Sequence, residues 1–230
     1  MIRFLPFLLL ILYGVAMWHF SAWSLKRQLD ANSRRLRDTR LDPILERLAR
    51  ALNVPEIPVY IFQVEPVNGL AAPDGRVFLT EGFMHKYRAG EVTPEEIGSV
   101  VAHELGHVAL GHSRRRMIDF SGQNALRVLL MTILGRLLPF IGIWIANILT
   151  TALAARLSQR DEFEADEFAS ALLIKAGLGT EPQKSLFAKL DALTKNPGEG
   201  VPAWLLTHPK TPRRIAAIEA NEARWTAPTA

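Results

Sequence analysis

The sequence TPEEIGSVVAHELGHVALGH, residues 93–112, contains three of the six histidines of the 230-residue chain. Thr93, Pro94 and Glu96 form a helix start: threonine suits the cap, proline the first helical position, and glutamate completes a capping box. Apolar residues follow on several faces, so the pattern predicts a largely buried helix that ends near Gly111. Buried histidines require a partner, and their spacing indicates which one.

His103 and His107 lie four residues apart, so on a helix they project from one face and can share a metal ion. Glu104 lies at the edge of that face, where its carboxylate can act as a general base. This is the HExxH pattern, in which two imidazoles bind zinc. The alternative interpretation is a pair of hydrogen-bonded core histidines. The motif predicts one Zn²⁺ per chain.

A catalytic zinc needs a third protein ligand. His112 does not fit the longer HExxHxxGxxH pattern, because residue 110 is leucine and residue 113 is serine. We therefore expect His112 to be a partly exposed residue at the helix end. The chain must supply the ligand elsewhere.

The segment SQRDEFEADEFASALL, residues 158–173, contains two acids four residues apart on a predicted helix. Glu162 can be the third ligand, and Asp166 can accept the second ring N–H of a zinc histidine, which we expect to be His103. The alternative is a solvated acidic face. We expect the neighbouring acids to form such a face, namely Asp161, Glu164 and Glu167.

Composition narrows the possible partners. The chain has no cysteine, which excludes disulfides and thiolate metal ligands. Its net charge is +4 and its pI about 9.6, but many basic residues fall in KRQLDANSRRLRDTR, residues 26–40. This segment directly follows an apolar run, so it predicts a juxtamembrane flank and not a nucleic-acid surface.

The apolar run, residues 4–23, has about 20 residues without charge, which is enough to cross a bilayer. We predict an N-terminal transmembrane anchor over residues 1–25; a cleaved signal peptide is the alternative. Positive charges after the run favour a cytoplasmic catalytic domain in a bacterial-type inner membrane, and a periplasmic orientation stays open.

The remaining sequence predicts an α+β fold, mainly helical with a small β-sheet. LDPILERLARAL, residues 41–52, has an apolar stripe typical of a short amphipathic helix, with Asp42 as its cap. IPVYIFQV, residues 57–64, and GRVFLTEGFM, residues 75–84, predict strands. The domain that contains the predicted zinc site is expected to span residues 41–224.

A second hydrophobic segment, residues 125–157, separates the two halves of the predicted zinc site. Hydropathy alone favours a transmembrane helix over residues 137–155. A single crossing would put the histidines and Glu162 on opposite sides of the bilayer, so it is excluded. We predict a helical hairpin bent around residues 135–139, partly packed on the domain and partly in or on the membrane; a buried pair of core helices is the alternative.

The motifs HELGH, DEFEAD and HPKTPRRI occur in this order. Over residues 41–220 the chain resembles the HtpX-like zinc metalloproteases, gluzincins that include the CaaX prenyl proteases and the mitochondrial overlapping-activity protease. The resemblance implies zinc on His103, His107 and Glu162, with Glu104 as the base and Asp166 behind the ligands.

The resemblance also implies two further parts of the site. The segment VNGLAAPDGRVFLTEGF would include an edge strand that pairs with substrate backbone, with Asn68 and Ala71 as substrate-binding residues. His208 and Arg214 would lie near the reaction centre and stabilise the oxyanion.

These observations predict a membrane-anchored zinc endopeptidase that cleaves unfolded or membrane-associated polypeptides in protein quality control. Its expected partners are polypeptide substrates and membrane lipid, without nucleic acid. One alternative is a zinc hydrolase of another kind, such as an aminopeptidase. Another is a membrane scaffold or holdase that keeps the fold, although such a protein would have no chemical need for Glu104.

Overall fold

The computed structural model describes residues 26–72, 74–194 and 211–226, together with Leu12, Val15, Ala16, His19, Phe20, Trp23 and Ser24. The elements are β1 (Ser33–Arg35), α2 (Asp42–Leu52), β2 (Val59–Phe62), β3 (Gly69–Ala71), β4 (Val77–Thr80), α3 (Glu81–Arg88), α4 (Pro94–Ala109), α5 (His112–Leu137), α6 (Gly142–Lys175), α7 (Glu181–Thr194) and α9 (Thr211–Thr226). The predicted α+β class is confirmed.

The four strands form one mixed sheet in the order β1-β2-β4-β3. β2 and β4 are parallel, whereas β1 and β3 pair antiparallel to their neighbours at the two edges. Every residue of β4 is buried. The two edge strands have three residues each, and β3 is the edge that lies against α4.

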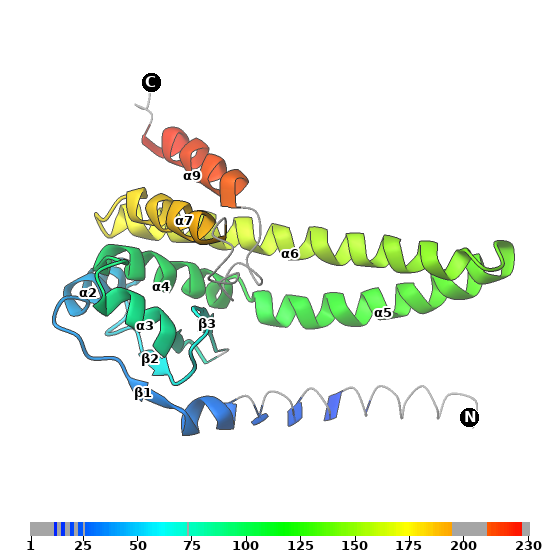
Figure 1. Ribbon diagram of the computed structural model, residues 1–230, viewed down its shortest axis with the longest axis horizontal. Helices are drawn as coiled ribbons and strands as arrows, with labels where there is room; N and C mark the ends of the chain where they lie inside the picture. Colours follow the sequence, from blue (N-terminus) through cyan, green and yellow to red (C-terminus); the bar gives the residue numbers. More distant parts are fainter. Residues whose placement is uncertain are drawn as a thin grey trace.

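Helix α4 lies between the sheet and the pair α6 and α7 (Figure 1). The predicted capping box is present, because the Thr93 side chain accepts from the Glu96 N–H and the Glu96 side chain accepts from the Thr93 N–H. The helix ends at Ala109, close to the predicted Gly111. With Ile97 and Val101 fully buried, α4 is at the centre of the hydrophobic core.

The start of α2 differs from the prediction. Leu41, not Asp42, is the N-cap residue, and no side chain caps the helix. The carboxylate that binds backbone N–H groups just before the helix belongs to Asp38, which accepts hydrogen bonds from Arg40 and Leu41. Asp42 lies in the first turn, where its charge favours the helix N-terminus.

The basic segment 26–40 contributes structure to the domain. It contains β1, and its residues Leu29 and Leu36 are buried. Arg34 pairs with Glu81 across the sheet. The sequence analysis did not predict this strand, because its consecutive arginines resemble the basic flank of a membrane segment.

The predicted N-terminal anchor falls mostly outside the described residues. Within the part of the chain that the structure describes, no helix is both long and apolar enough to cross a membrane.

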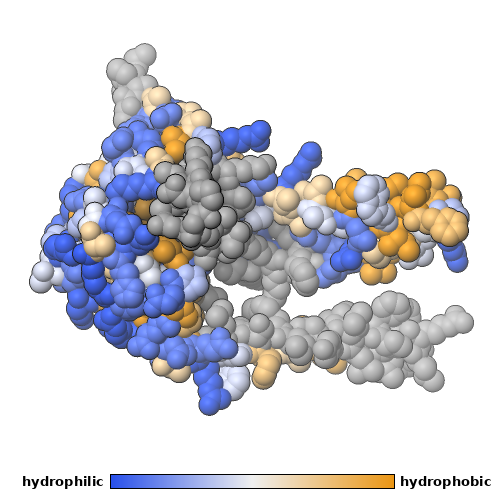
Figure 2. All heavy atoms as spheres, in the orientation of Figure 1, coloured by the Kyte–Doolittle hydropathy of each residue, from blue (hydrophilic) through white to orange (hydrophobic). Residues whose placement is uncertain are grey.

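Helices α5 and α6 pack against each other and extend away from the rest of the molecule (Figure 1). The chain reverses between Leu137 and Gly142, at the end of the predicted bend, where Phe140 has a positive φ of 75°. The far part of this hairpin is an exposed apolar surface (Figure 2). A wholly buried pair of core helices is therefore wrong for this segment.

Candidate metal centre

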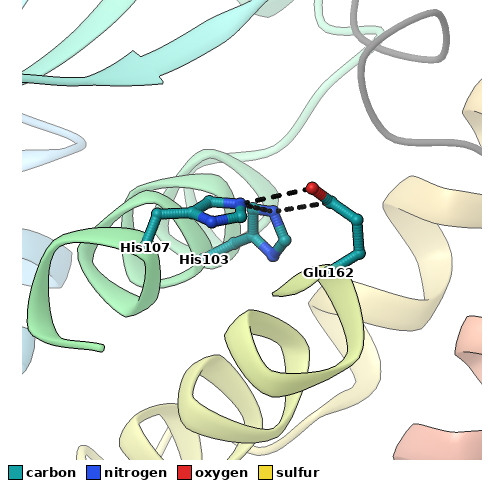
Figure 3. A group of neighbouring side chains, drawn as sticks. All are labelled: His103, His107 and Glu162. Carbon is teal, nitrogen blue, oxygen red and sulfur yellow. Dashed lines mark hydrogen bonds and ion pairs between the residues drawn. The ribbon is translucent and has the colours of Figure 1, made fainter. Parts of the chain in front are cut away.

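Helix α4 presents His103 and His107 on one face, as the four-residue spacing requires (Figure 3). Their Nε2 atoms are 3.1 Å apart. Both side chains are buried, as is Glu104 between them in the sequence. The two imidazoles therefore converge on one point inside the domain.

Glu162 reaches this point from α6 (Figure 3). Its carboxylate oxygens lie 3.5 Å from His103 Nε2 and 3.6 Å from His107 Nε2. Gly106 makes this approach of the two helices possible, because a Cβ at residue 106 would lie 2.9 Å from the carbonyl oxygen of Ala165. A glycine one residue before His107 thus brings the two halves of the site together.

The three donors fit zinc. Ligands bound at about 2.0–2.1 Å in a tetrahedron are separated by about 3.3 Å, close to the observed separations of 3.1, 3.5 and 3.6 Å. Two imidazoles and one carboxylate are the donor set of many catalytic zinc sites, and they leave a fourth position for water or substrate. The residues would therefore hold zinc without rearrangement of the backbone.

Asp166 lies behind His103 and fixes its orientation. Its Oδ1 is 2.9 Å from His103 Nδ1, so the ring donates its Nδ1–H to the carboxylate and directs Nε2 to the metal point. Burial opposes the charged form of Asp166, but the charge and hydrogen bonds of Arg214 outweigh it, and the pKa of Asp166 is lowered. Asp166 therefore stays ionised in the interior.

Burial by itself would lower the pKa of His103. Hydrogen bonds to Asp166 and Glu162 have the opposite and larger effect, so the pKa of His103 is raised to about 9. Because zinc binds the neutral imidazole, a zinc ion at this site would displace a proton from the ring.

Arg214, on α9, is fully buried and bound on both sides of its guanidinium group. Nε and Nη2 donate to the two oxygens of Asp166 at 2.6 and 2.7 Å, a bidentate pair. Nη1 lies 3.7 Å from Glu162, and the group stacks over the Phe187 ring at 4.4 Å. This geometry favours a role in holding Asp166 over direct contact with a substrate oxyanion.

His112 does not lie at an exposed helix end, so that expectation is wrong. It is buried, and its Nδ1 is 2.7 Å from Nδ1 of His107. The reason is Gly111, whose φ of 66° turns the chain so that α5 starts at His112 and directs its side chain back to α4. A glycine beside a histidine was the sequence signal for this turn.

The acids expected to be solvated divide into two groups. Glu167 is exposed and pairs with Arg224, as expected. Asp161 is buried, and Arg115 pairs with both Asp161 and Glu164. His112, Asp161 and Glu164 could form a second group of metal donors, but this arginine binds both carboxylates, so we interpret the group as an ion-pair network.

Strand β3 lies beside Glu104. A Cβ at Gly69 would be 2.9 Å from Val100 Cγ1 and 3.3 Å from Glu104 Oε1, so only glycine lets the strand approach the base this closely. The Asn68 carboxamide oxygen accepts from the Gly69 N–H, and the Asn68 N–H donates to Thr80. Ala71 ends the same edge strand, opposite Val77.

His208 lies outside the described residues, so the structure does not place it relative to the other site residues. All the other candidate site residues lie within the described part of the chain. They are the three ligands together with Glu104, Asp166, Arg214 and the edge strand.

Comparisons with known proteins identify the family of this chain. Residues 35–222 match the model of peptidase family M48. The chain is 29% identical to the metalloprotease LoiP of Escherichia coli over 67% of its own length and 59% of the relative's. It is also 29% identical to the E. coli metalloprotease YcaL, over 78% of this chain and 67% of that protein.

A third relative is the mitochondrial metalloendopeptidase OMA1 of Schizosaccharomyces pombe, 29% identical over 66% of this chain and 42% of that protein. The chain thus spans less than two thirds of the length of LoiP and less than half that of OMA1.

Proposed function

Because this chain belongs to peptidase family M48, we propose that it is a zinc-dependent endopeptidase that cleaves extended polypeptides at the His103–His107–Glu162 centre. The observation that supports this most directly is the position of Glu104. It lies on the ligand helix directly after His103, is buried, and has its Oε1 against Gly69 of the edge strand β3.

Zinc in this centre would supply Lewis acidity, which lowers the pKa of a water ligand and polarises the scissile carbonyl. Glu104 would accept the proton of the attacking water and return it to the departing amine nitrogen. Asp166 and Arg214 would hold His103 in one tautomer and one orientation throughout. We assign oxyanion stabilisation to His208, from the resemblance alone.

We infer that substrate adds as a strand to β3. An edge strand has unpaired backbone groups, and Gly69 brings this edge next to Glu104. Asn68 fixes the start of the strand through its hydrogen bonds, and Ala71 marks its other end. Backbone pairing selects extended chains with little regard to side chains, so unfolded polypeptides are the expected substrates.

We also propose that the N-terminal apolar run anchors the protein in a bacterial-type inner membrane. An uncharged run of about 20 residues followed by basic residues supports it. A membrane-held peptidase for unfolded chains would suit quality control.

The test is Glu104→Gln, assayed for casein cleavage and for zinc content. Cleavage should fall at least 10³-fold, because glutamine cannot accept the proton, while zinc stays at one per chain. Glu95→Gln is the matched control, since Glu95 is half-buried on the same helix but at its first turn. Casein cleavage by wild-type protein should also stop on addition of a chelator.

Wild-type cleavage by Glu104→Gln would contradict the assigned base. Activity confined to substrates with a free amino terminus would favour the aminopeptidase alternative. Full suppression of client aggregation by Glu104→Gln, with no cleavage by the wild type, would favour the holdase.

A further inference from the structure

The far part of the α5–α6 hairpin, residues 125–157, is apolar and exposed on both helices (Figure 2). Among its most exposed side chains are Val128, Leu129, Leu137, Phe140, Trp144 and Leu149, with Phe140 at 102% and Trp144 at 67% of full exposure. The catalytic domain covers none of these six.

The exposure is not confined to one stripe. Adjacent residues are exposed together at Val128–Leu129, Ile143–Trp144 and Ile148–Leu149, and adjacent side chains on a helix point about 100° apart. A partner protein that docks on a helix contacts one face, at three- and four-residue spacing. Exposed apolar side chains on several faces, beyond the face that packs on the neighbouring helix, are instead typical of a helix surrounded by lipid.

The charged residues of the hairpin also favour a lipid environment. Residues 125–160 contain no aspartate or glutamate, and their only charged residues are Arg127, Arg136, Arg156 and Arg160, all exposed. Arg127 and Arg156 lie toward the base of the hairpin, one on each helix, where they can bind lipid phosphates. The bilayer that best complements this hairpin is therefore anionic.

The length of the hairpin sets the depth of insertion. From Arg127 to the end of α5 is about 15 Å, and from Arg156 to the start of α6 about 21 Å, at 1.5 Å per residue. One leaflet of a hydrocarbon core about 30 Å thick measures about 15 Å, which the α5 segment matches and the longer α6 segment matches when it is tilted. Arg136, near the turn, favours a tilted insertion that lets its long side chain reach phosphates.

We propose that residues 125–157 insert as a hairpin into one leaflet of an anionic bilayer and hold the zinc centre at the lipid headgroups. Glu162 follows Arg156 by six residues on the continuous helix α6, a rise of about 9 Å. Resting on the proposed peptidase activity, this places the active site where it meets polypeptide segments at the membrane surface.

Single cysteines in this cysteine-free chain test the depth. Phe140→Cys and Trp144→Cys report on the hairpin, and Ala171→Cys is the matched control, exposed on α6 beyond Glu162. Each would carry a fluorophore in full-length Glu104→Gln protein reconstituted into 3:1 phosphatidylcholine–phosphatidylglycerol vesicles. Lipids with quenchers in their acyl chains should quench the first two labels several-fold more than the third.

Equal quenching at all three sites would overturn the insertion. The insertion would also be overturned if an impermeant maleimide reacted with unlabelled Phe140→Cys and Trp144→Cys as fast as with Ala171→Cys. Protection of both hairpin cysteines without lipid, with cross-linking between copies, would show that a second copy covers the surface. Because the protein is inactive, these results do not depend on the peptidase activity.

The substrate class has its own test in active protein. Peptides tethered to the vesicle lipid by short linkers should be cleaved at least tenfold faster than the same peptides in solution at equal total concentration. Equal rates would overturn the membrane-surface substrate class. Failure to cleave either peptide would count against the proposed function while leaving the depth result standing.

A separate observation concerns the other zinc histidine. His107 Nδ1 is 2.7 Å from His112 Nδ1, and His112 Nε2 is 3.3 Å from Glu164 Oε2. A carboxylate can only accept, so the neutral His112 ring carries its proton on Nε2, and its Nδ1 then accepts from His107. This hydrogen-bond order makes Nε2 the unprotonated nitrogen of His107, the one that can bind zinc.

We infer that His112 is a positioning residue for His107, as Asp166 is for His103. His112→Phe should weaken zinc binding about 10–100-fold, measured by competition with a chelating indicator. His112→Asn, whose carboxamide oxygen can accept from His107, should restore part of the affinity. His85→Phe, at an exposed histidine of α3, is the control.

Urea unfolding of each variant in chelator separates fold from metal site. An unchanged zinc affinity in His112→Phe would overturn the inference, as would an affinity loss that His112→Asn does not reverse.

Discussion

The Asp166–Arg214 pair connects the stability of the domain with its affinity for zinc, and substitutions can separate the two. Both side chains are buried, and two hydrogen bonds of 2.6 and 2.7 Å join them. Asp166 also accepts from His103 at 2.9 Å. We compare Arg214→Met with the double variant Asp166→Leu and Arg214→Met.

The single variant Arg214→Met leaves the buried carboxylate of Asp166 without the guanidinium group that pairs with it. Loss of one partner from a buried pair costs about 3–5 kcal/mol of unfolding free energy. We expect the lower end, about 3 kcal/mol, because His103 and the Gln183 carboxamide at 3.4 Å still donate to Asp166. Its zinc affinity should fall by about tenfold or less, since Asp166 can still orient His103.

The double variant removes both charges. Apolar replacement of a whole buried pair is often neutral or stabilising, so most of the lost unfolding free energy should return. His103 now lacks its acceptor, and zinc affinity should fall about 10–100-fold. The double variant should therefore be more stable than Arg214→Met yet bind zinc more weakly.

Urea denaturation in chelator gives the stabilities, and titration against a zinc indicator gives the affinities, both in one detergent. If stability and affinity change in the same order across the two variants, the assigned roles of Asp166 and Arg214 are wrong.

Three further predictions follow from close contacts and from one carboxylate. Gly106→Ala should weaken zinc binding at least tenfold in an indicator titration, because its Cβ would meet the Ala165 carbonyl at 2.9 Å and separate the ligand helices; unchanged affinity would show that α6 adjusts. Gly69→Ala should lower kcat/KM about tenfold with zinc retained, since its Cβ approaches Glu104 to 3.3 Å; loss of zinc instead would give β3 a structural role. Burial opposes ionisation of Asp38, but its hydrogen bonds outweigh this and lower its pKa, so its contribution to stability is present above the unfolded pKa near 3.8 and is lost as pH falls through the lower folded value. The wild type should exceed Asp38→Asn by about 1 kcal/mol in urea unfolding at pH 7, and a difference that does not shrink toward pH 3 would contradict this.

Much of helix α4 was predictable because its signals are local. Thr93, Pro94 and Glu96 define its start within four residues, and side-chain direction on any helix places His103 and His107 together. The reversal of the chain near Pro139 was also foreseeable, since a single membrane crossing would separate the ligands. Strand β1 was not, because three residues with two arginines have no apolar alternation.

The sequence by itself determined the α+β class, through local helix and strand patterns. It also determined the capped ligand helix and the pairing of its two histidines, since these follow from interactions within one or two helical turns. Only the tertiary structure decided that His112 turns back to His107, that Asp161 is buried, and that Arg214 binds Asp166. These contacts join residues from different helices, and packing at positions such as Gly106 sets how close the helices come. Spacing along one helix can predict which side chains share a face, but not which distant element packs against that face.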